Sequence, residues 1–243
     1  MGTAIRPTGI NNVAAAMRNL EHRQELVANN LANVSTDGFK GERAFARLLA
    51  DGSTPAIDTA TDFRSGPITQ TGAPLDLALT GPGFFVVQSP AGERYSRGGS
   101  LRLDDNGHLV DPNGNALLGE SESGEPSGPI IVPSDARDIH ISSAGAVVTG
   151  TTPIGQLRLE RVTANTRLQH DAGGLFLPPT TRTPIANADR TIRQGAREES
   201  NVTSIESLVD MISIQRAYAS AQKVMTTIDS ARGLSVSEIG KPV

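Results

Sequence analysis

The sequence contains no cysteine and no tryptophan, and aromatic residues make up only 3% of its 243 residues. Without cysteine, the chain can form no disulfide, no thiolate nucleophile and no cysteine-ligated metal site. No apolar run approaches the ~18 residues that a membrane-spanning helix needs. The 22 basic and 26 acidic residues give a net charge of −4, and no basic block offers a surface for nucleic acid. A core of aliphatic residues is therefore expected.

Sequence patterns typical of enzymes are also missing. The segment Gly81-Pro82-Gly83 begins like a dinucleotide-binding loop, but it has no third glycine and precedes a predicted strand rather than a helix. The four histidines never take the spacing of a metalloprotease helix. The chain contains no nucleophile elbow of the G-x-S-x-G kind. We therefore predict no enzymatic activity, no cofactor, no metal site and no small-molecule substrate.

Glycine and proline divide the chain into three parts. The 25 glycines and 15 prolines avoid residues 10–34 and 203–232 completely. This distribution predicts long helices at both ends and turn-rich β-structure between them, which is an α+β fold with short antiparallel strands. The predicted divisions are an N-terminal helix within 1–34, an extended linker at 35–74, a β-rich domain at 75–190, a return linker at 191–202, and a C-terminal helix and tail at 203–243.

The N-terminal helix carries a heptad pattern. Its seam repeats at alternating intervals of three and four residues and is apolar except at Gln24: Ile10, Val13, Met17, Leu20, Gln24, Val27, Leu31 and Val34. A seam sustained over about three heptads predicts a helix that pairs with another helix as a coiled coil. An ordinary amphipathic helix on a globular domain is the alternative.

The C-terminal helix carries two apolar stripes. The first consists of Val202, Ile205, Val209 and Ile212 with Leu208 at its flank, and the second of Ile214, Tyr218, Ala221, Met225 and Ile228. At about 100° per residue, the second stripe lies roughly 160° around the helix from the first. Such a helix needs a cover on two sides, and we predict the N-terminal helix and a neighbouring subunit as the covers. A helix threaded through its own core is the alternative. These seam and stripe residues are the candidate assembly contacts.

The central residues predict short strands. Alternating segments occur at 75–79, 101–103 and 156–160, and apolar segments typical of buried strands at 84–87, 130–132 and 146–148. The segments Asp105-Asn106-Gly107 and Pro112-Asn113-Gly114 predict turns between three strands of a meander. Two polar, turn-rich stretches, 119–128 and 178–191, are predicted as loops.

The most specific pattern closes the first predicted helix. Residues 29–40, NNLANVSTDGFK, combine helix-terminating Asn and Ser/Thr with a turn glycine, Gly38, and an aromatic anchor, Phe39. This string resembles the N-terminal signature of bacterial flagellar axial proteins, the rod and hook family. The segments ALTGPGFFVV at 78–87 and YSRGGSLRLDDNGHLVDPNGNALLG at 95–119 resemble the β-domain of that family, and residues 199–229 resemble its C-terminal helix block. The signature residues that the resemblance assigns are Asn29, Asn30, Leu31, Ala32, Asn33, Gly38, Phe39, Ser200, Asn201 and Val202.

The resemblance implies a structural subunit of the flagellar basal-body rod, the drive shaft that transmits torque from motor to hook. The terminal helices, within 1–34 and 203–243, would pair as an inner coiled-coil tube with the β-domain outside. The partners would be copies of the chain, other rod and hook proteins, and the flagellar type III export apparatus. Export would deliver the subunit to the periplasmic rod without a cleaved signal peptide, and none is predicted at the start of the chain.

Two alternatives are open, one about the position of the chain within the rod family and one about the class of protein. The chain length and the short link between Phe39 and Gly66 favour a proximal rod member, and a distal rod member is the alternative. A monomeric β-domain binding module with a helical stalk is the alternative from another class. Such a module would display exposed aromatic residues, whereas most of the seven aromatics in the central region have apolar neighbours, as is typical of a core.

Overall fold

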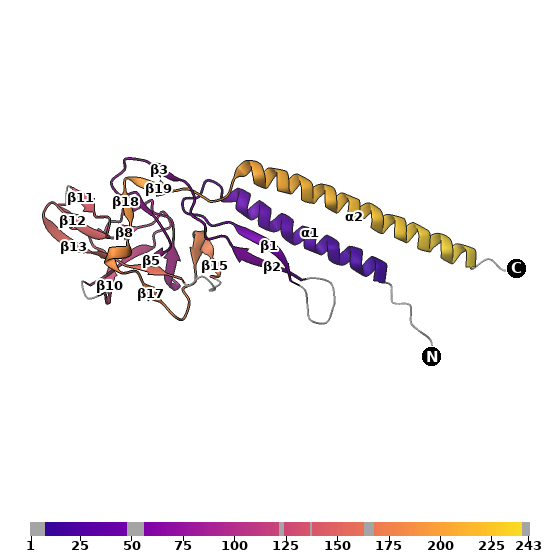
Figure 1. The fold of residues 1–243 in the computed structure, drawn as a ribbon, viewed down its shortest axis with the longest axis horizontal. Coiled ribbons are helices and arrows are strands. Elements are labelled where there is room, and N and C mark those ends of the chain that lie inside the picture. The colour runs from indigo at the N-terminus through magenta and orange to yellow at the C-terminus, as the bar shows by residue number, and fades with distance from the viewer. Residues whose placement is uncertain (1–7, 48–55, 122–123, 137, 163–167, 240–243) are drawn as a thin grey trace. The chain divides into compact units, whose positions relative to one another are not determined.

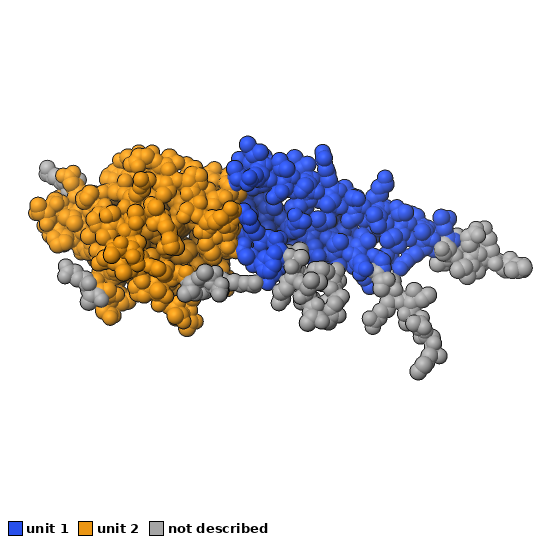
Figure 2. All heavy atoms as spheres, viewed as in Figure 1, with its two compact units in different colours: residues 1–32, 42–60, 203–243 blue, residues 33–41, 61–202 orange. Residues whose placement is uncertain are grey.

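The computed structural model describes residues 8–47, 56–121, 124–136, 138–162 and 168–239, which form two compact units. Unit 1 comprises residues 1–32, 42–60 and 203–243, and unit 2 comprises residues 33–41 and 61–202 (Figure 2). Each unit is therefore assembled from segments that are far apart in the sequence.

Unit 1 is a pair of antiparallel helices with a β-hairpin beside the first helix (Figure 1). Helix α1 spans Thr8–Ala32 and α2 spans Ser204–Ile239, while β1 (Glu42–Arg47) pairs with β2 (Ala56–Thr61). Helix α2 continues past the predicted end at 232, because the single Gly233 weakens a helix by only about 1 kcal/mol. Within the described residues, neither helix is apolar enough over a sufficient length to cross a membrane.

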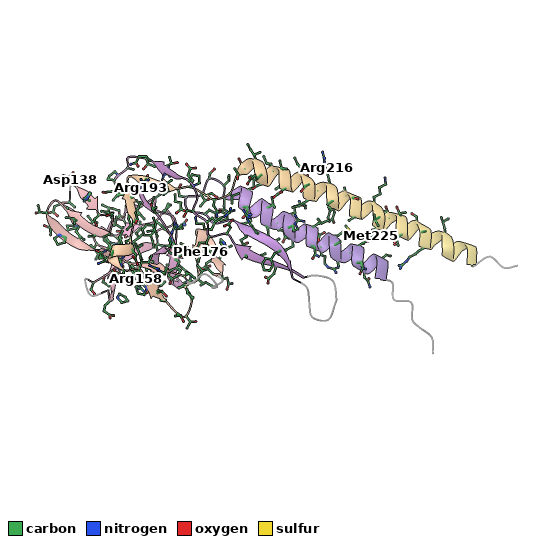
Figure 3. The ribbon with its side chains drawn as sticks, viewed as in Figure 1. Asp138, Arg158, Phe176, Arg193, Arg216 and Met225 are labelled. Carbon is green, nitrogen blue, oxygen red and sulfur yellow. The ribbon has the colours of Figure 1, made fainter. Side chains whose placement is uncertain are left out.

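The least exposed face of α2 has heptad spacing. Its members repeat at intervals of four and three residues: Ser207, Met211, Ile214, Tyr218, Ala221, Met225 and Ile228. The Tyr218 hydroxyl donates to Oε1 of Glu21 on α1 at 3.0 Å, so this face is turned toward α1. Figure 3 shows Met225 on this inward side and Arg216 on the outer side. On α1, the predicted seam is half-buried and Leu26 is buried. The helices therefore pack together, and their supercoiling as a coiled coil stays a prediction.

In the described part of unit 2, thirteen antiparallel strands form the main sheet, with the central order β11-β12-β13-β9-β5-β6-β16-β15. Its strands are β5 (Phe84–Ser89), β6 (Gly92–Ser96), β7 (Arg102–Leu103), β8 (Leu109–Val110), β9 (Ala116–Glu120), β10 (Pro126–Pro129), β11 (Ile139–Ile141), β12 (Ala146–Thr149), β13 (Thr152–Leu157), β14 (Leu159–Arg161), β15 (His170–Asp171), β16 (Leu175–Phe176) and β17 (Thr183–Pro184). Short 3-10 helices occur at Ala172–Gly174 and Asn187–Asp189.

Two smaller sheets join the beginning and the end of unit 2. Strand β3 (Ile68–Gln70) pairs with β19 (Ala196–Glu198), and β4 (Leu77–Leu79) pairs with β18 (Ile192–Gln194). Strands β1 to β3, β18 and β19 lie in the stretches that the sequence assigned to linkers, 35–74 and 191–202. Long-range pairing makes these segments part of the two units.

Several strand predictions are confirmed, and the exceptions have physical causes. The segments 84–87, 101–103 and 146–148 lie at β5, β7 and β12. The segment 156–160 is divided into β13 and β14 at Arg158, whose buried guanidinium donates to Glu160 at 2.8 Å. The alternation predicted for 75–79 is wrong, since all of β4 is buried. Strand β18 pairs with one edge of β4, and on the other the Leu77 N–H donates to the Gly99 carbonyl.

The predictions for 119–128 and 130–132 are also corrected. The first stretch, predicted as a loop, contains the end of β9 and most of β10, whose residues are all exposed and therefore give no apolar signal. The second, predicted as a buried strand, is buried at Ile130 and Val132 and makes backbone hydrogen bonds with residues 107, 109 and 117. It is nevertheless not a strand, because its only ladder contact in the described residues is the isolated bridge between Ile131 and His108. The stretch 178–191 is irregular apart from β17 and one 3-10 turn.

One turn geometry recurs in hairpins of unit 2, at 104–108, 111–115 and 142–146. In each, the side-chain oxygen of the first residue accepts from the N–H of the fifth, and the carbonyl of the first accepts from the N–H of the fourth. The fourth residue is a glycine with φ of 80°, 85° or 93°. This is a type I turn followed by a left-handed glycine. The predicted turns at 105–107 and 112–114 are therefore confirmed.

Gly107→Ala should destabilise unit 2 more than Gly114→Ala, although both glycines hold the same place in the turn. The positive φ alone makes alanine unfavourable by about 1–2 kcal/mol at either position. A Cβ on Gly107 would lie 2.4 Å from the carbonyl oxygen of Val132, whereas nothing lies within 4 Å of one on Gly114. Overpacking adds about 1–3 kcal/mol at Gly107. Urea unfolding of both variants measures the difference, and equal losses would contradict the close approach.

The core of unit 2 is aliphatic, with a smaller aromatic cluster beside it. In that cluster the Phe84 ring stacks on Tyr95, and Phe176 packs edge-on against Phe84. Most of the seven central aromatics are buried, as predicted: Phe39, Phe84, Phe85, Tyr95 and Phe176. The other two, Phe45 and Phe63, are 37% and 40% exposed.

Candidate functional site

Residues 38–41 run beside residues 198–201 within unit 2, and we call these two segments the junction. Backbone hydrogen bonds join them, from Gly38 to the Glu198 carbonyl at 2.7 Å and from Asn201 to the Phe39 carbonyl at 3.2 Å. Along the chain, the first segment follows α1 and the second precedes α2. The junction therefore joins the part of unit 2 that follows α1 in the sequence to the part that precedes α2.

Glu198 is a buried carboxylate between two buried cations. Its Oε1 accepts from Lys40 Nζ at 2.5 Å, and its Oε2 accepts from Arg97 Nε at 2.6 Å. The backbone N–H of Gly66 adds a third donor at 2.9 Å. Lys40 and Glu198 are 1% exposed and Arg97 is 3% exposed. In such a site the loss of one partner leaves the others as uncompensated buried charges.

Arg97 also holds the loop that follows β4. Its Nη1 donates to the Gly83 carbonyl at 2.5 Å, and its Nη2 donates to the Gly81 and Leu79 carbonyls at 2.7 and 2.9 Å. The planar guanidinium fork suits several acceptors at once. The glycine loop at 81–83 thus presents carbonyls to an arginine rather than N–H groups to a phosphate.

Two cations share the single carboxylate of Glu198, and this arrangement shifts the pKa of Lys40. Burial lowers the pKa of the Lys40 ammonium below its usual value, and the charge of Arg97 lowers it further. The hydrogen bond and the charge of Glu198 oppose this change. The Lys40 ammonium also donates to the Arg64 carbonyl at 3.0 Å. Glu198 is therefore the group on which the buried charges of the junction depend.

The Asn201 side chain connects the junction to a third segment. Its Oδ1 accepts from the Gly41 N–H at 2.8 Å, and its Nδ2 donates to the carbonyls of Asp62 and Arg64 at 2.6 and 3.1 Å. One amide therefore fixes backbone groups on both sides of the β1–β2 hairpin in sequence.

Gly38 and Phe39 fit the junction for steric reasons. Gly38 has φ of 66°, and a Cβ there would lie 2.4 Å from the backbone carbon of Arg97. The Phe39 ring is buried, with its centroid 6.0 Å from that of His170. The turn glycine and the aromatic anchor of the sequence pattern thus take the roles that were predicted for them.

A polar pocket of about 340 Å³ lies next to the junction. Its lining residues are Val34, Ser35, Asp37, Thr69, Arg197, Glu199 and Ser200. Arg197 donates to Asp37 at 2.8 Å, and Glu199 accepts from the Thr69 hydroxyl at 2.6 Å. Across the described ranges, no cluster of His, Asp or Glu side chains could hold a metal ion. Arg197 and Asp37 of this pocket are therefore paired with each other, whereas the Glu199 carboxylate has a neutral partner.

Comparison with known proteins places the chain in a family. The family model for a flagella basal body rod protein matches residues 10–40, that for the D1 domain of flagellar hook protein FlgE/F/G matches 78–149, and that for the C-terminal part of flagellar basal body rod FlgEFG protein matches 193–233. The flagellar basal-body rod protein FlgF of Caulobacter vibrioides is 33% identical over 91% of this chain and 94% of its own length. The chain belongs to the flagellar basal-body rod proteins.

Two further rod proteins are similar to most of this chain. FlgF of Escherichia coli is 32% identical over 87% of this chain and 90% of its own length. FlgG of Buchnera aphidicola subsp. Acyrthosiphon pisum is 34% identical over 84% of this chain and 89% of its own length. The resemblance stated from the sequence is thereby confirmed, and the chain is a FlgF-like structural subunit of the rod.

The rod-family signature residues divide between the two units. Gly38, Phe39, Ser200 and Asn201 meet at the junction, where the Ser200 hydroxyl also accepts from the N–H of Val202 at 3.2 Å. In unit 1, the Asn30 side chain binds both backbone groups of Glu42, with distances of 2.8 and 2.9 Å. The remaining members lie near the end of α1: Asn29 and Ala32 are exposed, Leu31 is half-buried, and Asn33 accepts from Thr36.

The charged residues of the junction were not among the predicted site residues. Lys40 is the last residue of the rod-family signature string. Its place in that string indicates a role, although it is neither a helix-capping nor an aromatic residue. Glu198 lies in β19, where the alternating burial of 196–198 is too short to detect in the sequence. Arg97 lies in the segment 95–119 that resembles the β-domain of the family, but the sequence around it does not indicate its role, because its partners are 14 to 101 residues away.

The structure separates the candidate assembly residues of this rod protein by exposure. The first stripe of α2 is open: Ile205 is 73%, Val209 59%, Ile212 50% and Leu208 48% exposed. The second stripe lies on the inward face, where Ile214 is 2% exposed and Tyr218, Met225 and Ile228 are half-buried. On α1, the inward residues Val13, Met17, Leu20, Val27 and Leu31 are half-buried.

Proposed function

We propose that this rod subunit is a proximal member of the shaft and polymerises through its terminal helices. The observation that carries the proposal is the exposed first stripe of α2. Ile205, Leu208, Val209 and Ile212 lie on consecutive turns, on the side of α2 away from the inward face. Contiguous apolar side chains in water favour association. Because α1 already covers the inward face, the cover of this stripe is a neighbouring subunit.

Family membership supports the wider mechanism. The subunit would contact copies of itself and other rod and hook proteins, and would transmit torque from motor to hook without enzymatic activity. The heptad faces of α1 and α2 support pairing as a coiled coil in the assembled rod. Delivery to the periplasmic rod would use the flagellar type III export apparatus without a cleaved signal peptide.

A distal, FlgG-like position is the alternative within the family, since FlgF and FlgG relatives cover the chain to similar extents. A monomeric binding module with a helical stalk is less well supported, because five of the seven central aromatics are buried. The predicted boundaries at 34, 74, 190 and 202 belong to the same proposal, as do the candidate assembly residues. Pairing of β18 with β4 and of β19 with β3 extends the folded β-unit beyond 75–190.

Ile212→Asp should block assembly without unfolding the subunit. Half of the Ile212 side chain is already in water, so aspartate there leaves the packing of α1 on α2 intact in the free subunit. In an interface between subunits, an unpaired carboxylate costs several kcal/mol, and the defect repeats in every copy. A strain expressing only this variant is expected to lose motility, and its purified basal bodies to lack the rod. Circular dichroism of the purified variant should match wild type.

The matched control is Arg102→Asp, which adds a carboxylate at an exposed position of β7. Motility and rods should persist in that strain. Normal rods with Ile212→Asp would mean that no neighbour covers the first stripe, and the proposed mode of polymerisation would fail.

A further inference from the structure

Among the residues that the structure describes, the main sheet of unit 2 ends at β11, which pairs with β12 on one side only. An edge strand presents N–H and C=O groups with which a strand of another chain can pair. Alternate residues of a strand direct these groups to the same side. The groups of Ile139 and Ile141 therefore share one edge of β11.

The side chain of Gln194 occupies this edge. Its Nε2 donates to the Ile139 carbonyl at 2.9 Å, and its Oε1 accepts from the Ile141 N–H at 3.1 Å. Nε2 also donates to the Pro74 carbonyl at 2.7 Å. One amide thus satisfies a carbonyl and an N–H that an added strand would use in a ladder.

The backbone of Gln194 is fixed independently of this contact. It lies in β18, in register with Leu77 of β4. Ile192, two residues earlier in the same strand, faces the core and is 3% exposed. The amide is therefore held against β11 by a strand that belongs to a different sheet.

Strand β11 has the composition of a strand that pairs readily. Its sequence is Ile-His-Ile, with two β-branched residues around the exposed His140. It carries neither proline nor a charged residue of the kind that protects edges. The β10 edge differs, because it begins and ends with proline, Pro126 and Pro129.

We propose that Gln194 is an edge plug that keeps β11 from pairing with a β-strand of a second copy of the chain. The identity of the partner rests on the proposed function, since polymerisation holds many copies at high local concentration. The inference that Gln194 blocks the edge depends only on its hydrogen bonds to β11. Loss of the amide turns the β11 edge into a pairing surface.

Gln194→Ala in the full chain tests the plug. Loss of one hydrogen bond of ordinary strength speeds exchange of the Ile141 amide about tenfold, measured by hydrogen exchange at single-residue resolution. Sedimentation should show more association than wild type at equal concentration, with an intermolecular β band in the infrared spectrum. The matched control is Gln88→Ala, because within the described residues the Gln88 amide bonds only to the adjacent Ser89 carbonyl. It should behave as wild type.

A second variant separates an open edge from general misfolding. Gln194→Ala combined with His140→Lys leaves the plug absent but adds a charge to the edge, which opposes strand pairing. Its Ile141 amide should exchange quickly while its association returns to the wild-type level. Association that persists in the double variant would overturn the proposal. So would unchanged exchange or unchanged association in Gln194→Ala. The Ile212→Asp strain tests the proposed function separately, since that variant leaves β11 intact.

Discussion

Glu198→Gln should lower the unfolding free energy of unit 2 by about 3–5 kcal/mol, the usual loss when one partner of a buried ion pair is removed. Glutamine keeps the shape of the side chain but leaves the Lys40 ammonium and the Arg97 guanidinium without a counter-charge. For a unit of this size, the melting temperature should fall by roughly 10 °C. Thermal unfolding followed by circular dichroism measures the change, because the chain has no tryptophan for fluorescence.

The neighbouring residue supplies the control. Glu199 carries the same carboxylate but is exposed, with a bond to the Thr69 hydroxyl, so Glu199→Gln should change stability by less than about 0.5 kcal/mol. Adding Lys40→Met to Glu198→Gln removes one stranded cation and should restore part of the loss, which a double-mutant cycle quantifies. Equal melting temperatures for the Glu198 and Glu199 variants would show that the buried charges do not stabilise the junction.

A fragment of residues 75–190 should fail to fold cooperatively, whereas residues 33–202 should fold. The shorter fragment lacks β3, β18 and β19, so β4 loses its partner strand and Arg97 loses its carboxylate. It also lacks Ile192, which is 3% exposed in the main core cluster. The longer fragment keeps every segment of unit 2. Circular dichroism melts distinguish a sigmoidal transition from a gradual loss of signal.

A third fragment, 61–202, isolates the contribution of the first half of the junction. It keeps all strands of unit 2 but lacks Gly38 and Lys40, and therefore loses the hydrogen bonds of both residues to Glu198. We expect a cooperative transition at a lower temperature than that of 33–202. A cooperative melt of 75–190 at the temperature of 33–202 would show that the paired outer strands are dispensable.

The parts of the fold that could be predicted are those with a long or local signal. Heptad spacing runs through most of α1, and glycine-containing turns such as 104–108 fix their own geometry through bonds within five residues. The three-residue strands β18 and β19 have no such signal, because their partners β4 and β3 lie more than 100 residues away. Strand β10 escaped prediction because its exposed residues have no apolar pattern.

The candidate site could be predicted only in part, for a related reason. Gly38 and Phe39 have local roles, a positive φ and an aromatic anchor, which a short string reveals. Glu198 and Arg97 act through each other and through other groups that are distant in the sequence, so the sequence near either residue does not distinguish it from a surface charge. The exposed stripe was recognised as one of two apolar sides, but only the structure shows which side α1 covers.

The positions of the junction residues along the chain also determine the order in which contacts of this protein form during folding. Lys40 and Glu198 are separated by 158 positions in the chain, and a chain held extended cannot bring them together. Closing so large a loop is entropically costly and comes late in folding. Formation of the junction is therefore a late step in folding, because its carboxylate and its ammonium lie near opposite ends of unit 2 in the sequence.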